Sequence, residues 1–253
     1  MPLTRASIVC FALVALHADA AQELQSTLDD YRASQDVPGV SAVVVRHNDV
    51  VFAGASGVSD IASATPMTPD TLLYIGSVTK TLTAILMLQL IEADQLSLDD
   101  HVDSLGSTTD VTVMSLLTHS SGLPREGNFG YWFTGDFPDN GELREYLRTT
   151  PLHETPRASA RYSNIGYATL GLLAAQILDE DYSELLRARV LEPLQMNASG
   201  GRGPADGIAR GYTPADRVIP SAERPFAGVG EAVGNRYLRE YHDARAMSPA
   251  FGA

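Results

Sequence analysis

The chain has 253 residues, of which 44% are hydrophobic, so it holds enough apolar material for one large domain or two closely packed ones. Its formal net charge is −13 and it contains no basic run, which argues against nucleic acid and an anionic membrane surface as partners. The single cysteine, Cys10, lies within the first 20 residues, so the rest of the chain has no disulfide or cysteine-based metal site available.

Residues 1–20 have the pattern of a secretory signal peptide. Arg5 precedes an apolar stretch, and Ala18-Asp19-Ala20 has the small-x-small form of a cleavage site. The apolar stretch is too short to span a bilayer. We therefore expect a periplasmic or secreted protein whose mature chain has no membrane span.

The segment after residue 20 predicts a helix, a hairpin and a loop. Apolar residues recur at helical spacing over residues 22–34. Residues 40–46 and 50–55 are rich in β-branched side chains and predict two strands joined by residues 47–49. An isolated hairpin is marginally stable in water, so we expect other strands or the first helix to cover it. Residues 57–70 are rich in Ser, Ala and Pro and are predicted to form a loop.

The segment Gly76-Ser77-Val78-Thr79-Lys80-Thr81 leads into an apolar run, residues 82–91, that predicts a buried helix. If the run is helical, Ser77 and Lys80 project from one face of its first turn. This arrangement suits a nucleophile and its base, because an amine can take a hydroxyl proton where burial and neighbours lower its pKa.

Lys80 is the one lysine among the 18 lysine and arginine residues of the chain. Arginine cannot replace it as a base, because a guanidinium does not lose its proton in the accessible pH range. The alternative interpretation is structural: Ser77 caps the helix and Lys80 is a solvated residue of the first turn.

Residues 111–124 predict a short packed turn closed by Gly122 and Pro124. Residues 129–137 form an aromatic segment that contains Trp132. Its aromatic side chains either line a substrate cleft or fill a gap beneath the loop.

Three more helices are predicted, over residues 141–148 with Asn140 as the cap, over residues 168–177, and over residues 183–190. Before the second of these, Tyr162 and Asn164 are two residues apart, so in an extended segment both side chains point the same way. A phenol can exchange protons with an ammonium group, and an amide can orient a bound carbonyl. The alternative is that Tyr162 packs at the helix entrance and Asn164 caps the helix.

Together, these motifs resemble the serine β-lactamase and penicillin-binding-protein-like hydrolase family, class C type, in order and spacing from Gly39 to Tyr212. They are Ser77-Val78-Thr79-Lys80-Thr81, Leu116-Leu117-Thr118-His119-Ser120-Ser121-Gly122-Leu123-Pro124, Tyr162-Ser163-Asn164, and Glu192-Pro193-Leu194 with Met196. The resemblance implies an α+β fold of the β-lactamase/transpeptidase type, with an antiparallel sheet part packed on a helical part and the site between them.

The same resemblance implies a serine hydrolase that forms an acyl-enzyme with a β-lactam, a D-Ala peptide or a small ester. Carried over residue by residue, Ser77 is acylated, Lys80 and Tyr162 share proton transfer, and Asn164 positions the substrate amide. The expected partner is a small-molecule or peptidoglycan-like substrate. No metal or organic cofactor is expected, because no group of His, Asp and Glu has ligand spacing.

One motif of the family, Lys-Thr-Gly or His-x-Gly on a strand near the C-terminus, has no match in this chain. We therefore expect an incomplete sheet and poor turnover, because loss of one oxyanion donor costs about 10² to 10³ in rate. A truncated fragment, a shifted reading frame and a degenerated copy stay open as explanations. The alternative function is that of a catalytically impaired or non-catalytic relative that binds acyl or peptidoglycan-like ligands.

The predicted organisation is a signal peptide over residues 1–20, a hydrolase domain over residues 21–215 and an atypical tail over residues 216–253. Within the hydrolase domain, residues 22–66 form the sheet part and residues 67–215 the helical part.

Overall fold

The computed structural model describes residues 5–102, 111–126, 138–149, 159–200, 207–214, 229–233 and 237–240. The chain divides into two compact units, the first built on Met1–Leu73 with Asp206–Arg217 and Gly230–Glu240, the second built mainly on Tyr74–Ala205. Helices and small antiparallel sheets occupy separate stretches of the chain, so the fold class is α+β, as predicted.

The predicted hairpin is confirmed in unit 1. Strand β1 (Gly39–Arg46) pairs antiparallel with β2 (Asp49–Asp60), and the two-residue turn His47-Asn48 joins them. Both turn residues have positive φ, as the favoured two-residue hairpin turns require. The predicted loop is wrong at its start, because β2 continues through Asp60 and pairs there with β3 (Thr65–Pro66). Proline excludes a helix in this segment, but an edge strand tolerates its missing N–H.

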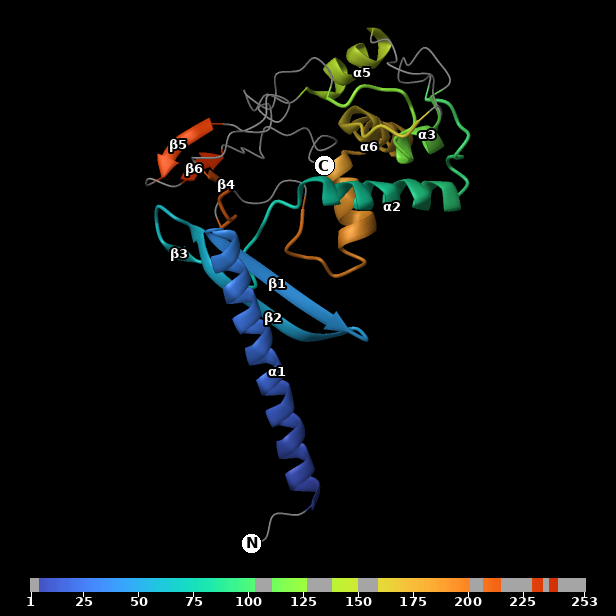
Figure 1. Ribbon diagram of the computed structural model, residues 1–253. Coiled ribbons are helices and arrows are strands. Elements are labelled where there is room, and N and C mark those ends of the chain that lie inside the picture. The colour runs from blue at the N-terminus through green and yellow to red at the C-terminus, as the bar shows by residue number, and fades with distance from the viewer. Residues whose placement is uncertain are drawn as a thin grey trace. The chain divides into compact units, whose positions relative to one another are not determined.

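Helix α1 (Arg5–Gln35) is continuous and lies along β2 in unit 1 (Figure 1). It begins earlier than predicted and passes through the residues of the expected signal peptide. Gln25 Nε2 donates to the carbonyl oxygen of Ala55 at 3.0 Å, and Arg32 Nε donates to Ser56 Oγ at 2.9 Å. The helix therefore covers part of the hairpin, as expected. Within the described ranges, no helix combines the length and the apolar character needed to cross a membrane.

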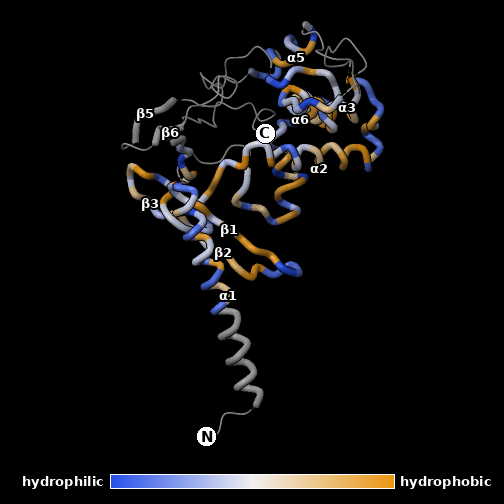
Figure 2. Tube along the Cα trace, viewed as in Figure 1, coloured by the Kyte–Doolittle hydropathy of each residue, from blue (hydrophilic) through white to orange (hydrophobic). Residues whose placement is uncertain are grey.

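The hairpin also carries an uncovered apolar surface near its turn. Figure 2 shows apolar strands that end in a hydrophilic turn. Five valines on this part of the hairpin are exposed, and together they are called the valine patch below: Val43, Val44, Val45, Val50 and Val51.

A second three-stranded sheet contains β4 (Tyr212–Pro214), β5 (Val229–Val233) and β6 (Tyr237–Glu240) in the order β4-β6-β5. Two of these strands lie in the tail, for which the sequence shows no clear periodicity. Their pairing depends on backbone hydrogen bonds, and the sequence does not predict the individual strands. The remainder of the tail and the predicted aromatic loop over residues 129–137 lie outside the described residues.

Unit 2 is helical among its described residues. Its elements are the 3₁₀ turn η1 (Gly76–Val78), then α2 (Thr79–Glu92), α3 (Val113–Leu117), α5 (Asn140–Thr149), α6 (Asn164–Leu178) and α7 (Tyr182–Leu186), which continues as the π-helical turn η3 (Arg187–Leu191). The last predicted helix, over residues 183–190, is thus an α-helix in its first half only.

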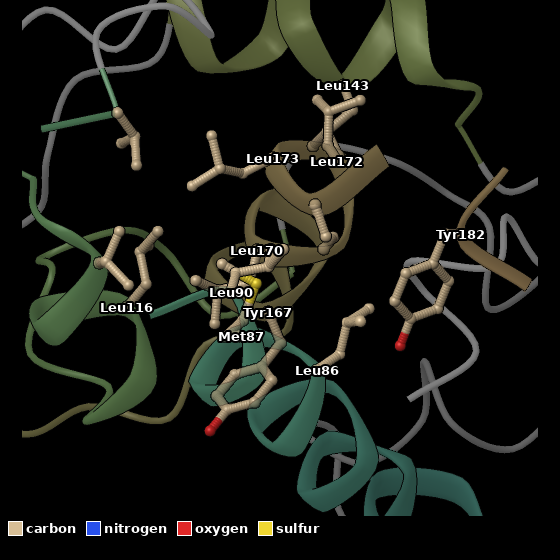
Figure 3. Packing of buried hydrophobic residues seen from close by; sticks show 14 of the residues in the cluster. Leu86, Met87, Leu90, Leu116, Leu143, Tyr167, Leu170, Leu172, Leu173 and Tyr182 are labelled. Carbon is tan, nitrogen blue, oxygen red and sulfur yellow. The ribbon is translucent and has the colours of Figure 1, made fainter. Parts of the chain in front are cut away.

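The core of unit 2 forms where α2, α3, α6 and α7 meet. Figure 3 shows Leu86, Met87 and Leu90 of α2 gathered with Leu170 of α6. Helix α6 is buried along its first three turns, which is why its sequence is apolar nearly all round. The predicted burial of α2 holds for one face, because Leu86, Met87 and Leu90 are buried whereas Leu88 is exposed.

Helix α5 is capped by a residue other than the predicted Asn140. Asp139 Oδ1 accepts a hydrogen bond from the backbone N–H of Glu142 at 2.8 Å, and Glu142 Oε2 accepts one from the N–H of Asp139 at 2.9 Å. This reciprocal pair is a capping box, which satisfies two backbone donors at once. Asn140 is instead the first residue of the helix.

Candidate active site

Ser77 lies in η1, immediately before α2, and Lys80 is the second residue of α2. The tight turn keeps residues i and i+3 on one side. Lys80 Nζ donates a long hydrogen bond to Ser77 Oγ at 3.5 Å. Ser77 is exposed, whereas Lys80 is only 6% exposed. The structural alternative is therefore wrong for both residues, because α2 has Val78 at its N-cap with no side-chain cap, and Lys80 is enclosed.

Tyr162 reaches the same serine from a distant part of the sequence. Its hydroxyl donates to Ser77 Oγ at 2.6 Å, and Lys80 Nζ lies 5.0 Å from the centroid of its ring. Two groups that can carry a proton thus converge on one hydroxyl oxygen. The Tyr162 hydroxyl therefore contacts Ser77, in addition to the packing of its ring.

The residues on either side of Tyr162 are fixed by hydrogen bonds to His119. The backbone N–H of Arg161 donates to the carbonyl oxygen of His119 at 2.7 Å, and the N–H of Ser163 donates to His119 Nδ1 at 3.1 Å. Ser163 Oγ also accepts from the N–H of Gly166 at 2.9 Å, which makes Ser163 the N-cap of α6. Asn164, which the alternative interpretation made the cap, is the first residue of the helix.

Asn164 is 7% exposed, and its amide contacts Glu126. Asn164 Nδ2 donates to both Glu126 carboxylate oxygens, at 2.8 and 2.9 Å. Its Oδ1 is buried and has no hydrogen-bond partner among the residues that the structure describes. The structure therefore brings Ser77, Lys80 and Tyr162 together and ties Asn164 to Glu126.

His119 and Glu126 are the two site residues that sequence reasoning did not assign. The His119 ring lies 4.6 Å from the ring of Tyr162 and 4.9 Å from that of Tyr167, measured between centroids. Burial, and secondarily the charge of Lys80, lower the pKa of His119 below its usual value. His119 belongs to the family-like segment of residues 116–124, which is a signal that could have identified it. The sequence contains no pattern that links Glu126 to Asn164.

The ring of Tyr167 also lies near that of His119, and its hydroxyl donates to the carbonyl oxygen of Leu117 at 3.0 Å. Burial, and then the neighbouring Tyr162, raise the pKa of Tyr167. Tyr167 therefore stays a neutral donor beside the imidazole. Arg125 lies over the other ring, with its Cζ 5.5 Å from the centroid of Tyr162. Among the described residues, no group of three or more His, Cys, Asp and Glu could hold a metal ion.

A family model described as Beta-lactamase matches residues 24–237. Among curated proteins, the chain is 27% identical to "Unguisins hydrolase ungD'" of Aspergillus campestris, over 89% of this chain and 46% of that protein. It is 28% identical to "Esterase EstB" of Burkholderia gladioli, over 78% of this chain and 56% of that protein.

Among solved structures, the chain is similar to D-amino acid amidase from Ochrobactrum anthropi in complex with D-phenylalanine. The TM-score is 0.74 at 25% identity, over 92% of this chain and 65% of that one. The chain thus spans about half the length of the curated relatives described above.

Proposed function

The chain belongs to the beta-lactamase family, and from that premise we propose that it is a serine hydrolase that forms an acyl-enzyme on Ser77. One observation carries the proposal. Ser77 Oγ is contacted by both Tyr162, at 2.6 Å, and Lys80, at 3.5 Å. A serine needs a neighbouring proton acceptor before it can act as a nucleophile, and each of these groups can serve when unprotonated.

In the proposed reaction, Ser77 Oγ attacks the substrate carbonyl and its proton passes to the Lys80 and Tyr162 pair. The bond from the carbonyl carbon to the leaving group breaks, and the leaving group takes up a proton from the same pair. Water then attacks the acyl-serine by the reverse route and releases the acid. The short contact between Tyr162 and Ser77 suits the phenol to the transfer, because proton transfer needs heavy atoms within about 2.6 to 3.2 Å.

The proposed substrate is a small ester, an amide of a D-amino acid or a β-lactam. The support is the chemistry in the names of the similar proteins, an esterase and a D-amino acid amidase, together with the family itself. We also propose export to a periplasm or to the exterior, from the signal-peptide pattern of residues 1–20.

Asn164 is proposed to position the substrate amide. Asn164 Nδ2 already donates to Glu126. The proposed role therefore requires either that the side-chain amide rotate toward the substrate, or that one of its two N–H groups donate to the substrate while the other keeps its bond to Glu126. The buried Oδ1 without a partner supports the proposal, because an unsatisfied acceptor gains free energy when a donor reaches it.

The test is intact mass after incubation with a p-nitrophenyl ester and, separately, with a penicillin. We expect the mass to rise by the acyl group, on Ser77, and the Ser77→Ala variant to stay unmodified. If neither reagent modifies a folded chain, the acyl-enzyme proposal fails, and the alternative of a non-catalytic relative that binds acyl ligands takes its place.

A further inference from the structure

His119 makes two hydrogen bonds to the segment around Tyr162 that the proposed reaction does not use. Its carbonyl oxygen accepts from the N–H of Arg161 and its Nδ1 accepts from the N–H of Ser163. These two bonds fix the residues immediately before and after Tyr162. The position of the phenol on Ser77 therefore depends on His119 from both sides.

The ring of His119 is held by aromatic neighbours. It lies close to the rings of Tyr162 and Tyr167, at centroid distances of 4.6 and 4.9 Å. His119 has a φ of 57°, in the left-handed region that non-glycine residues adopt uncommonly and in which Asn, Asp and His are enriched. In this orientation of the ring, Nδ1 accepts the hydrogen bond from the N–H of Ser163.

The hydrogen bond from Ser163 needs a lone pair on Nδ1. A neutral imidazole offers one, whereas an imidazolium carries N–H groups on both nitrogens and would set a donor against a donor. The charged and titratable groups that face this cluster are Lys80 of α2, Tyr162 itself, Tyr167 of α6 and Arg125 over the Tyr162 ring. Among them, the charge of Lys80 opposes a further positive charge on His119.

We propose that His119 is a positioning residue that, through its neutral Nδ1, holds the Tyr162 phenol on Ser77 and releases it when protonated, so that the site loses activity in acid. The inference rests on the function proposed above and adds to it a regulation by pH. Because the pKa of His119 is lowered in the folded chain, the folded form binds this proton less well than the unfolded chain. The stabilisation it provides is therefore complete above the ordinary value of 6.5 and is lost as the pH falls through the lower folded value.

Two substitutions test the hydrogen-bond acceptor and the aromatic ring of His119 separately. His119→Asn keeps an acceptor near the position of Nδ1, tolerates the positive φ and does not titrate. His119→Phe keeps an aromatic ring beside the two tyrosines and has no acceptor. His47→Asn is the matched control, because His47 also has positive φ, at 50°, but is an exposed turn residue of unit 1.

We expect His119→Asn to retain kcat within about 10-fold and to lose the part of the acid limb that His119 causes. An acid limb with any other cause would survive in this variant, so the difference between the two profiles isolates His119. We expect His119→Phe to lower kcat by about 10², the cost of displacing a catalytic group by about 1 Å, with KM little changed. The control should match the wild type at every pH.

A second measurement does not depend on activity. In the wild type, the amide proton of Ser163 should shift in ¹H–¹⁵N NMR spectra as His119 titrates, and this shift should be absent in His119→Asn. If His119→Phe is as active as the wild type, or if the Ser163 amide does not follow the His119 titration, the inference is overturned. If instead the amide titrates but Ser77 is never acylated, the proposed function fails while the bond to His119 stands.

Discussion

Ser77 Oγ accepts hydrogen bonds from two different side chains, and these two differ in what a conservative substitution removes. Replacing the lysine changes the basicity of a nitrogen, whereas replacing the tyrosine by phenylalanine removes one oxygen and little volume. Two predictions at the scale of single residues follow from this difference.

Lys80→Arg should abolish acylation of Ser77. The charge is kept, but guanidinium does not release its proton in the accessible pH range and cannot act as the base. Since Lys80 is 6% exposed, the larger side chain should also lower stability by about 1 to 3 kcal/mol without unfolding the chain. The measurements are the rate of mass gain and the thermal midpoint. A variant that keeps most of the wild-type rate would show that Lys80 is not the base.

Tyr162→Phe should lower the acylation rate by about 10² to 10⁴, the contribution of a positioned proton-transfer group. Tyr167→Phe is the control, because its hydroxyl bonds to the carbonyl oxygen of Leu117 and not to the serine. The control should lose about 0.5 to 1.5 kcal/mol of stability with little loss of rate. Equal rates for Tyr162→Phe and the wild type would return Tyr162 to a packing role.

Two different signals predict the grouping of Ser77, Lys80 and Tyr162. A spacing of three residues in a helical turn brings Ser77 and Lys80 together by local geometry alone. Tyr162 lies 85 residues from Ser77, and its placement came only from the family resemblance. The contacts of Asn164 with Glu126 and of Ser163 with His119 depend on how loops pack, so no local pattern in the sequence predicts them.

At the scale of elements, the start of α6 is tied to the segment before it by a buried amide. Glu126→Ala should destabilise the chain by about 1 to 3 kcal/mol, because it leaves Asn164 Nδ2 buried without the carboxylate that accepts from it. Urea unfolding measures the change. The matched control is Glu145→Ala, at an exposed ion pair with Arg148, which should leave stability unchanged. Equal stability of both variants would contradict this account of Glu126.

The hairpin of unit 1 carries the second prediction at this scale. The valine patch is exposed on strands β1 and β2, and the backbone of an edge strand can pair with another chain. The protein should therefore self-associate as its concentration rises. The double variant Val45→Thr and Val50→Thr keeps β-branched side chains and lowers the apolar exposure. Sedimentation velocity should show less association than in the wild type, while circular dichroism stays the same. Association that is unaffected by the two substitutions would place the contact elsewhere.

Element types were more predictable than their ends. The hairpin and the helices α2, α5 and α6 follow from β-branched runs and apolar periodicity, which are local signals. The extension of β2 to Asp60 depends on pairing with β3, and the cap of α5 on a reciprocal bond one residue earlier than expected. The strands in the tail depend on pairing with each other and with β4, which the periodicity of one segment does not reveal.

At the scale of the whole molecule, the formal net charge of −13 should select among substrates of equal reactivity. A negative surface raises the local concentration of cations and lowers that of anions, and salt screens both effects over about 10 Å at 0.1 M. We expect the ratio of kcat/KM for a quaternary-ammonium ester to that for a carboxylate ester to fall as salt rises. A neutral ester of the same leaving group is the control. A ratio independent of salt would mean that local contacts alone decide the preference.

Because the chain has a single lysine, an amine-reactive reagent has very few groups to modify. Besides the chain's amino terminus, only Lys80 can be labelled, and its 6% exposure shields it in the native state. The rate at which Lys80 takes up a label therefore measures how often the interior of unit 2 opens to solvent. A ligand bound at Ser77 should slow this labelling, so the labelling rate of Lys80 reports how often the site opens to solvent.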